Sequence, residues 1–333
     1  MKKYVFFVLF LSFFSAMAFA DEARYGDYRI TGPYTYRNLS IYLVHGGDTV
    51  DAGDYMTLEE ALDAGVLKIS ETGDVNTLRL ASRAKRKIFI QSGDIIKGGR
   101  QDRIIKNDLV INVNSGTVNI NVFCVEHGRW QKRGNEDAAY FNSSRKKIAS
   151  KGLKLAAREM SSQQGVWDEV AEEQDKLEKN VGAPVRAAES SSSLQLTLEN
   201  RNVEKLSDEY VDAIENLVSG QRDVVGYAFA INGGINSGDI YGNRTLFEKL
   251  WPKQIKASAV EAVSELDRDG NYGAPAVTEV SSWLDSAGSA ASEEKRIDDN
   301  NISRDQDTGE NMSYESYEPS APSEFIHKSV IKK

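Results

Sequence analysis

The sequence is poor in the residues that support several familiar kinds of chemistry. Its 333 residues include one cysteine, Cys124, and three histidines. A single cysteine excludes an intrachain disulfide, so the fold must be stabilised by its core. The histidines, His45, His127 and His327, lack the spacing of a zinc site, and no Ser-His-Asp order, Gly-x-Ser-x-Gly elbow or P-loop is present. We therefore expect neither a metal nor an organic cofactor.

Long apolar stretches are also missing after the N-terminus, so we expect no transmembrane segment in the mature chain. Two lysines at the N-terminus precede the apolar residues 4–14, and an uncleaved anchor would need about 20 continuous apolar residues. Ala18 and Ala20 are the small residues that signal peptidase recognises. The sequence predicts a signal peptide over residues 1–20, cleavage before Asp21 and a periplasmic or extracellular protein.

Charge is distributed unevenly along the chain. The formal net charge is −9, yet residues 79–158 hold 18 lysines and arginines against 6 aspartates and glutamates. Such an asymmetry favours an anion-seeking face. Pairing of this basic segment with the acidic remainder after folding is the alternative, and both stay open. A hydrophobic content of 40% with only six prolines is typical of a globular chain.

Hydrophobic periodicity predicts an α+β protein with a β-rich N-terminal half, a helical middle and a second small sheet closed by the C-terminal strands. Residues 118–124 alternate with a period of two, which places Cys124 on the inner face as a buried structural thiol. Strands are expected at residues 28–30, 39–44, 66–69, 88–90, 109–113, 118–124, 224–231, 312–318 and 325–331.

Thr57 and Glu60 have the spacing of a capping box, so a short helix is expected between Thr57 and Gly65. A break is expected at Pro252, because proline removes a backbone donor, and a loose acidic loop at residues 298–310. Longer helices are expected at residues 151–160, 166–179, 206–218, 245–266 and 277–285.

The tetrapeptide Ser-Gly-Asp-Ile occurs twice, at residues 92–95 and 237–240, each time after an apolar strand. An internal duplication would explain this, and so would two hairpins that use the same turn residues. We expect residues 21–333 to form a single domain, with residues 21–160 and 161–333 as its two halves if the duplication is real.

Several segments carry a family resemblance. Residues 89–103 (FIQSGDIIKGGRQDR), 122–130 (VFCVEHGRW), 226–232, 243–247 and 250–253 occur in the expected order. They resemble the ARG and rhodanese-phosphatase-superfamily-associated protein domain family, where ARG denotes ADP-ribosylglycohydrolase. The resemblance covers nearly all of the mature chain. It implies no established activity, and the association with ADP-ribose enzymes implies a nucleotide or ADP-ribose ligand.

The segment around the paired glycines is the best candidate for an anion site. Successive glycine amides can form a concave anion-binding surface, the basic side chains add charge, and the glutamine and aspartate can bind sugar hydroxyls. A simple hairpin turn with exposed basic residues is the alternative. The candidate residues are Lys97, Gly98, Gly99, Arg100, Gln101, Asp102 and Arg103.

A second candidate segment follows the alternating strand. Arg129 can bind an anion, Trp130 can stack on a flat ring, and Glu126 can act as a general base. The alternative is a Glu126–Arg129 ion pair with Trp130 in the core. Asp94 is the other candidate general base.

Three functions follow from these patterns. The first is a binding module for an anionic or nucleotide-like small molecule, related to ADP-ribose. The second is a hydrolase that uses Glu126 or Asp94 as its general base. The third is an envelope interaction protein without a small-molecule site. We expect no nucleic-acid partner, because the basic segment lacks the pattern of a groove-binding helix. The sequence leaves the oligomeric state open.

Overall fold

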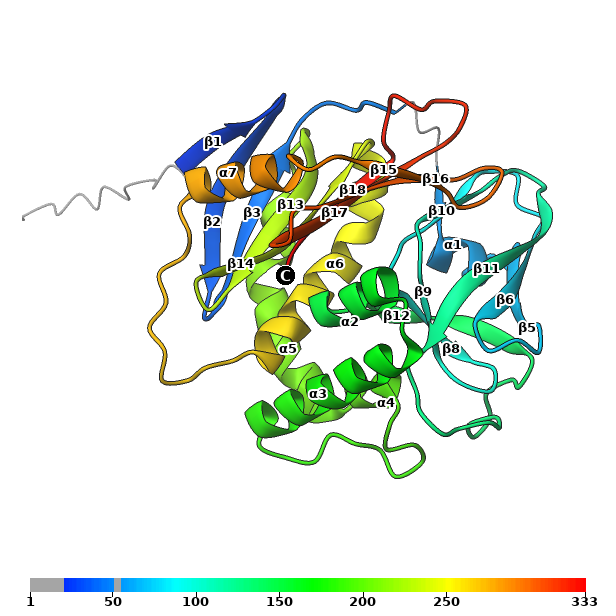
Figure 1. Ribbon diagram of the computed structural model, residues 1–333. Coiled ribbons are helices and arrows are strands. Elements are labelled where there is room, and N and C mark those ends of the chain that lie inside the picture. The colour runs from blue at the N-terminus through cyan, green and yellow to red at the C-terminus, as the bar shows by residue number, and fades with distance from the viewer. Residues whose placement is uncertain (1–20, 51–54) are drawn as a thin grey trace, which may run out of the picture.

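A computed structural model describes residues 21–50 and 55–333 of the chain (Figure 1). The predicted signal peptide, residues 1–20, lies outside the described residues. Within the described part, helices and strands are both abundant, which confirms the α+β class. The strands there form a nine-stranded antiparallel sheet, a three-stranded sheet and a closed barrel.

The large sheet joins strands from both ends of the chain. Its strands are, in spatial order, β1 (Asp21–Tyr25), β2 (Tyr28–Tyr36), β3 (Leu39–His45), β13 (Val224–Ile231), β14 (Gly234–Tyr241), β18 (His327–Lys332), β17 (Asn311–Tyr317), β16 (Ile302–Asp307) and β15 (Glu293–Arg296). The prediction that the C-terminal strands close a second small sheet is wrong, because these strands continue the sheet that β1 begins. Strand β13 is buried along its whole length and pairs with β3 on one edge and β14 on the other. An apolar run indicates such a buried strand but not its distant partners.

Helices cover both faces of this sheet. On one face, α7 (Val277–Ala287) packs Val280 and Leu284 against Tyr42 and Ala228. The other face carries the long helix α6 (Arg244–Ser264) together with α3 (Gln163–Val181) and α5 (Arg201–Ile214) (Figure 1). Because neighbouring residues of a strand point to opposite faces, a central strand covered on both sides is apolar throughout.

The barrel is formed by the segment in which the alternating pattern is clearest. Its strands are, in order, β11 (Gly116–Cys124), β6 (Thr77–Ser82), β5 (Leu67–Glu71), β12 (Tyr140–Ile148), β8 (Asp94–Gly98) and β9 (Arg103–Ile105). Ile120 and Val122 point inward and meet Leu78 and Leu80. Cys124 is 2% exposed, which confirms a buried thiol, and burial raises its pKa.

Beside the barrel, β10 (Leu109–Ile111), β7 (Ile88–Ile90) and β4 (Met56–Thr57) form the small sheet. The α1 helix (Leu58–Asp63) follows, and its capping box between Thr57 and Glu60 is present as predicted. The remaining helices are α2 (Lys151–Leu155) with a π-helical turn (Ala156–Met160), α3 (Gln163–Val181), α4 (Leu194–Leu198), α5 (Arg201–Ile214) and a 3-10 turn (Glu215–Val218). In the described residues, no helix has both the length and the apolar character needed to cross a bilayer.

Two local expectations are corrected. The α6 helix continues through Pro252, since Trp251, Ile255 and the following turns are held in the core between the sheet and α5. The expected acidic loop contains β16, which pairs with β15 over residues 302–305 and with β17 over residues 302–307. Tertiary packing and strand pairing outweigh local composition at both places.

The repeated Ser-Gly-Asp-Ile segments occupy different settings. Asp94 begins β8 in the barrel, whereas Asp239 lies within β14 of the large sheet. Gly93 has a φ of 90° and turns the chain into β8, whereas Gly238 lies inside a paired strand. Residues 21–160 and 161–333 both contribute strands to the large sheet.

Candidate functional site

The predicted anion-binding segment directs its backbone amides at partners within the protein. The amide of Gly98 donates to Asp102 Oδ1 (3.1 Å), and that of Gly99 donates to a carbonyl of β12 (3.1 Å). The amide of Arg100 donates to Glu71 Oε1 (2.9 Å). These amides are already hydrogen-bonded, which corrects the expectation that the paired glycines leave them open to an anion.

The two candidate segments do come together, as a network of buried ion pairs. Arg129 Nη1 donates to Gly99 O (3.3 Å), and Arg129 Nε lies 2.7 Å from Glu126 Oε1. Arg133 Nη1 lies 2.9 Å from Asp102 Oδ2. Both carboxylates are fully buried. The guanidinium groups are therefore neutralised by the protein itself and brace the mouth of the barrel.

The remaining candidates are spread over different environments. Arg103 is 1% exposed, and Gln101 is fully buried with its Nε2 donating to Glu126 O (2.9 Å). Lys97 forms an ion pair with the glutamate that ends α4 (2.8 Å). Trp130 is 56% exposed, so it is not a core residue. Neither of the two pockets described below is lined by these side chains or by the paired glycines.

The two candidate general bases are enclosed by charged partners. Asp94 is 1% exposed and lies 2.6 Å from Lys253 Nζ. Burial raises the pKa of Asp94 to about 6 against the opposing effect of Lys253. In Glu126, burial acts in the same direction, but hydrogen bonds from Arg129 lower the pKa overall. Neither carboxyl group lines the pocket described next.

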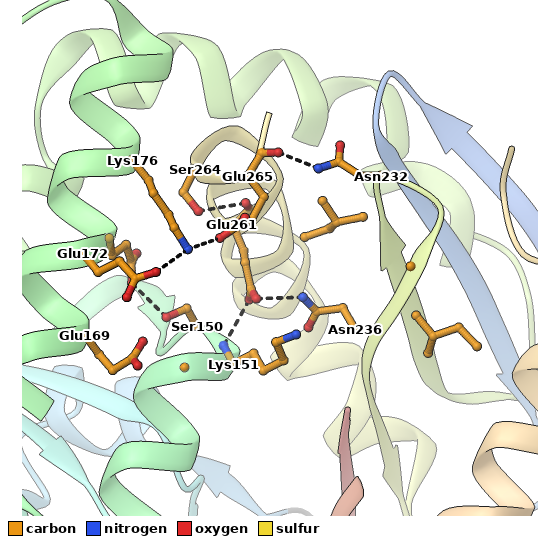
Figure 2. Close-up of a pocket in the computed structure, with 15 residues that line it drawn as sticks. Ser150, Lys151, Glu169, Glu172, Lys176, Asn232, Asn236, Glu261, Ser264 and Glu265 are labelled. Atoms are coloured by element: carbon orange, nitrogen blue, oxygen red, sulfur yellow. Dashed lines mark hydrogen bonds and ion pairs between the residues drawn. The ribbon is translucent and has the colours of Figure 1, made fainter. Parts of the chain in front are cut away.

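A pocket of about 380 Å³ opens between α2, α3, α6 and the β13–β14 turn (Figure 2). None of its lining residues belongs to the predicted site. Amide and hydroxyl groups of Asn232, Asn236, Ser150 and Ser264 form part of the wall. Its charged lining residues are Glu169, Glu172, Glu173, Glu261, Glu265, Lys151 and Lys176. The lining is rich in hydrogen-bond acceptors and carries an excess of negative charge.

Glu261 projects from α6 into the centre of this wall (Figure 2) and is 8% exposed. Its Oε1 accepts from Asn236 Nδ2 (2.8 Å), and its Oε2 accepts from the amide of Lys151 (3.2 Å). Burial raises the pKa of Glu261, and these hydrogen bonds offset only part of that effect. Among the described residues, no lysine or arginine forms a direct ion pair with it, but the charges of Lys151 and Lys154 also lower its pKa in part.

Asn236 gives a second sign that this wall is incomplete. Its side chain is 5% exposed, and its Oδ1 is buried without a hydrogen-bond donor among the residues that the structure describes. Buried polar atoms in proteins nearly always have a partner. Within the described residues, the wall therefore presents a carboxylate without a direct ion pair beside an amide oxygen without a donor.

Glu169, on α3, lies across the pocket beside Gly152 of α2 (Figure 2). A Cβ on Gly152 would collide with Glu169 Oε2, so glycine makes room for this carboxylate. In the described part of the chain the carboxylate has no hydrogen bond or ion pair. Burial and then the charge of Glu172 raise its pKa.

Lys176 neutralises the rim of the pocket. Its Nζ lies 2.8 Å from Glu172 Oε1 and 2.7 Å from Glu265 Oε1, and these hydrogen bonds raise its pKa despite some burial. The other lysine of the lining, Lys151, binds Glu261 through its backbone only. Glu169 and Glu261, which have no direct ion pair among the described residues, both line this pocket.

Sequence patterns contained a signal for this pocket that the prediction missed. Glu261 stands alone among alanines and valines in residues 259–263 of a helix, where a lone carboxylate is unusual. The α3 carboxylates at 169, 172 and 173 share a helical face with Lys176. The pairing of these two helices could not be derived from either pattern.

A hydroxyl–imidazole–carboxylate series also exists, although no sequence motif indicated it. Thr31 Oγ1 lies 2.8 Å from His45 Nε2, and His45 Nδ1 lies 2.9 Å from Asp223 Oδ1. This is the connectivity of a nucleophile, base and orienting acid. Thr31, however, lies within the paired strand β2 and is 7% exposed. We interpret the series as a satisfied polar contact between β2, β3 and the start of β13.

The fold and the pocket together define an α+β domain with an acidic, partly buried pocket. The chain belongs to the ARG and rhodanese-phosphatase-superfamily-associated protein domain family, whose model matches residues 27–331. This match confirms the resemblance seen in the sequence. No curated protein and no solved structure matches the chain.

Proposed function

We propose that this protein is an exported binding module for a small, positively charged molecule that donates hydrogen bonds, such as an amine, a guanidine or an amino sugar. One observation carries the proposal. In the described part of the chain, Glu261 is a buried carboxylate without a direct ion pair at the wall of a pocket large enough for a small molecule.

The physical reason is the cost of that carboxylate. A buried charge is unfavourable unless it is paired, and the raised pKa of Glu261 reflects this penalty. A ligand ammonium group would supply a direct ion pair where the interaction is least screened by water. A second donor on the ligand could satisfy Asn236 Oδ1, and Glu169 offers a further carboxylate.

The charge of the pocket also selects between ligand classes. An anionic nucleotide or ADP-ribose would enter a wall with five glutamates and two lysines, which opposes the ligand expected from the family association. In residues 21–50 and 55–333, no three histidine, cysteine or acidic side chains are grouped as metal ligands. An organic cation fits this wall best.

The test is a thermal-shift series with matched probes: putrescine against 1,4-butanediol, arginine against citrulline, and glucosamine against glucose. Binding to the folded state raises the melting temperature. We expect at least one cation to stabilise the wild type more than its neutral partner does. Glu261→Gln should abolish this difference, whereas Glu279→Gln, on the exposed side of α7, should retain it. Equal shifts within every pair would refute the proposal.

A hydrolase remains the second candidate, and it has support in one observation. Glu169 and Glu261 are two carboxyl groups of raised pKa that line the same pocket. One protonated and one ionised carboxyl are the groups that glycoside hydrolysis requires. Turnover of nitrophenyl glycosides that both Glu169→Gln and Glu261→Gln abolish would favour this reading over binding alone.

Export is part of the proposal and has its own test. Residues 1–20 have the composition of a signal peptide, with the small residues Ala18 and Ala20 before Asp21. We expect the chain expressed in a Gram-negative host to leave the cytoplasm and to start at Asp21 on N-terminal sequencing. Recovery of the intact N-terminus in the cytoplasm would contradict export.

A further inference from the structure

A second hollow lies on the opposite side of α3 from the Glu261 pocket. It has a volume of about 270 Å³ and is lined by Trp167 and Asp168 of α3, by His127 after β11, and by Arg186 in the segment between α3 and α4. Residues 167, 171 and 174, which line this hollow, face away from residues 169, 173 and 176 on a helix. The two hollows therefore share a helix but no lining residue.

Aromatic rings form one corner of this hollow. The rings of His127 and Trp167 stand 4.4 Å apart, centroid to centroid, at an interplanar angle of 76°. His127 is exposed and Trp167 is half-buried. The indole Nε1 of Trp167 is buried without an acceptor among the described residues. An aromatic corner with an unused donor is suited to a ligand that is apolar on one face and polar at its edge.

Planar polar side chains surround the aromatic corner. Gln164 Nε2 donates to Asp168 Oδ1 (2.8 Å), which leaves Gln164 Oε1 and Asp168 Oδ2 directed to no partner in the described residues. Arg186 is held in place by Asp175 Oδ1 (2.7 Å). Asp168 and Arg186 contribute opposite charges, so this lining is close to neutral, unlike that of the Glu261 pocket.

We propose that this hollow binds a neutral sugar ring. A pyranose presents C–H groups to aromatic rings and hydroxyl groups to planar amide, carboxylate and guanidinium side chains. Two rings at 76° make a corner, whereas a flat nucleobase is best held on a single face or in a parallel slot. A volume equal to that of about nine liquid water molecules matches one ring and not an oligosaccharide.

The test is saturation-transfer NMR on the full chain with methyl glucoside, methyl galactoside, methyl xyloside and N-acetylglucosamine. We expect at least one of these sugars to bind. Trp167→Ala should weaken that binding by about tenfold or more, since it removes the stacking surface. His127→Ala should weaken it less. Trp130→Ala is the matched control, because this tryptophan is exposed and outside the hollow, and it should bind as the wild type does.

Glu261→Gln separates this proposal from the proposed function. It should leave sugar binding unchanged, because Glu261 lines only the other pocket. Trp167→Phe is the folding control, and a melting temperature equal to that of the wild type would show that substitution at this position does not unfold the protein. Because phenylalanine keeps an aromatic ring, Trp167→Phe should retain part of the sugar binding. Sugar binding that survives Trp167→Ala, or no binding of any of the four sugars to the wild type, would overturn the proposal.

Discussion

His327 illustrates how single buried residues hold the parts of this fold together. It is fully buried, with Nδ1 2.7 Å from Asp108 Oδ2 and Nε2 3.1 Å from Asp239 Oδ1. Burial lowers its pKa, but the two carboxylates outweigh burial and raise the pKa to about 9. Asp108 follows β9, whereas Asp239 lies in β14, so a charged imidazole links the barrel side to the large sheet.

This linkage predicts a loss of stability in alkali. The contribution of His327 is complete below its unfolded pKa of 6.5 and is lost as the pH rises through about 9. The shift corresponds to about 3 kcal/mol of unfolding free energy. Urea unfolding at pH 6 and pH 10 measures it. His327→Gln should be less stable than the wild type at pH 6 and should lose less stability between pH 6 and pH 10. An equal loss of stability in both proteins would contradict the raised pKa of His327.

Glu261 makes the opposite kind of contribution. Its pKa is raised, so folding favours its protonated form, and the ionised form destabilises the native state as the pH rises above 4.5. Glu261→Gln should therefore melt at an equal or higher temperature than the wild type at pH 7.5, with a smaller advantage at pH 4. Thermal unfolding by circular dichroism measures this. A variant that is less stable only at pH 7.5 would show that Glu261 has a counter-ion.

At the scale of elements, the close approach of α2 and α3 shapes the acidic pocket. Gly152→Ala improves helix propensity by about 1 kcal/mol, and its new methyl group must displace the flexible Glu169 side chain. The expected result is unchanged or higher stability together with weaker amine binding. Calorimetric titration and thermal unfolding of the same samples measure both. Amine binding equal to that of the wild type would remove Glu169 from the site.

The buried ion pairs at the barrel mouth are a second feature at this scale. Arg133 is 8% exposed and pairs with Asp102 and Glu136. Arg133→Ala should cost about 3–5 kcal/mol of unfolding free energy, because it leaves Asp102 buried without its main partner. Urea unfolding measures the loss. The exposed pair of Arg296 is the control, and Arg296→Ala should change stability by less than about 1 kcal/mol.

Local signals account for what could be predicted from the sequence. The Thr57 capping box and the alternation over residues 118–124 depend on neighbours only, and both are present in the fold. The continuity of α6 through Pro252 and the pairing of β16 depend on distant partners, which no local pattern contains. The convergence of the two candidate segments was predicted. The carboxylates that neutralise their arginines also come from within those segments. The sequence alone could not show whether these arginines bind a ligand or the protein's own carboxylates.

At the scale of the whole molecule, the basic segment is neutralised by the acidic remainder. Lys87 lies 2.7 Å from Glu318, and Arg158 lies 2.7 Å from Asp305. These pairs favour the second of the two explanations for the charge asymmetry, in which folding brings the opposite charges together. The acidic side chains that do not pair with the basic segment lie elsewhere in the protein. Some of them, on α3 and α6, line the Glu261 pocket.

The most direct test of this account is a crystal structure of the protein with the cation that gives the largest thermal shift. The account predicts the cationic nitrogen of the ligand between Glu261 and Glu169, within hydrogen-bonding distance of at least one carboxylate, about 2.7–3.2 Å. A ligand bound among Lys97, Arg100 and Arg129, or an empty pocket with Lys151 turned inward against Glu261, would contradict it.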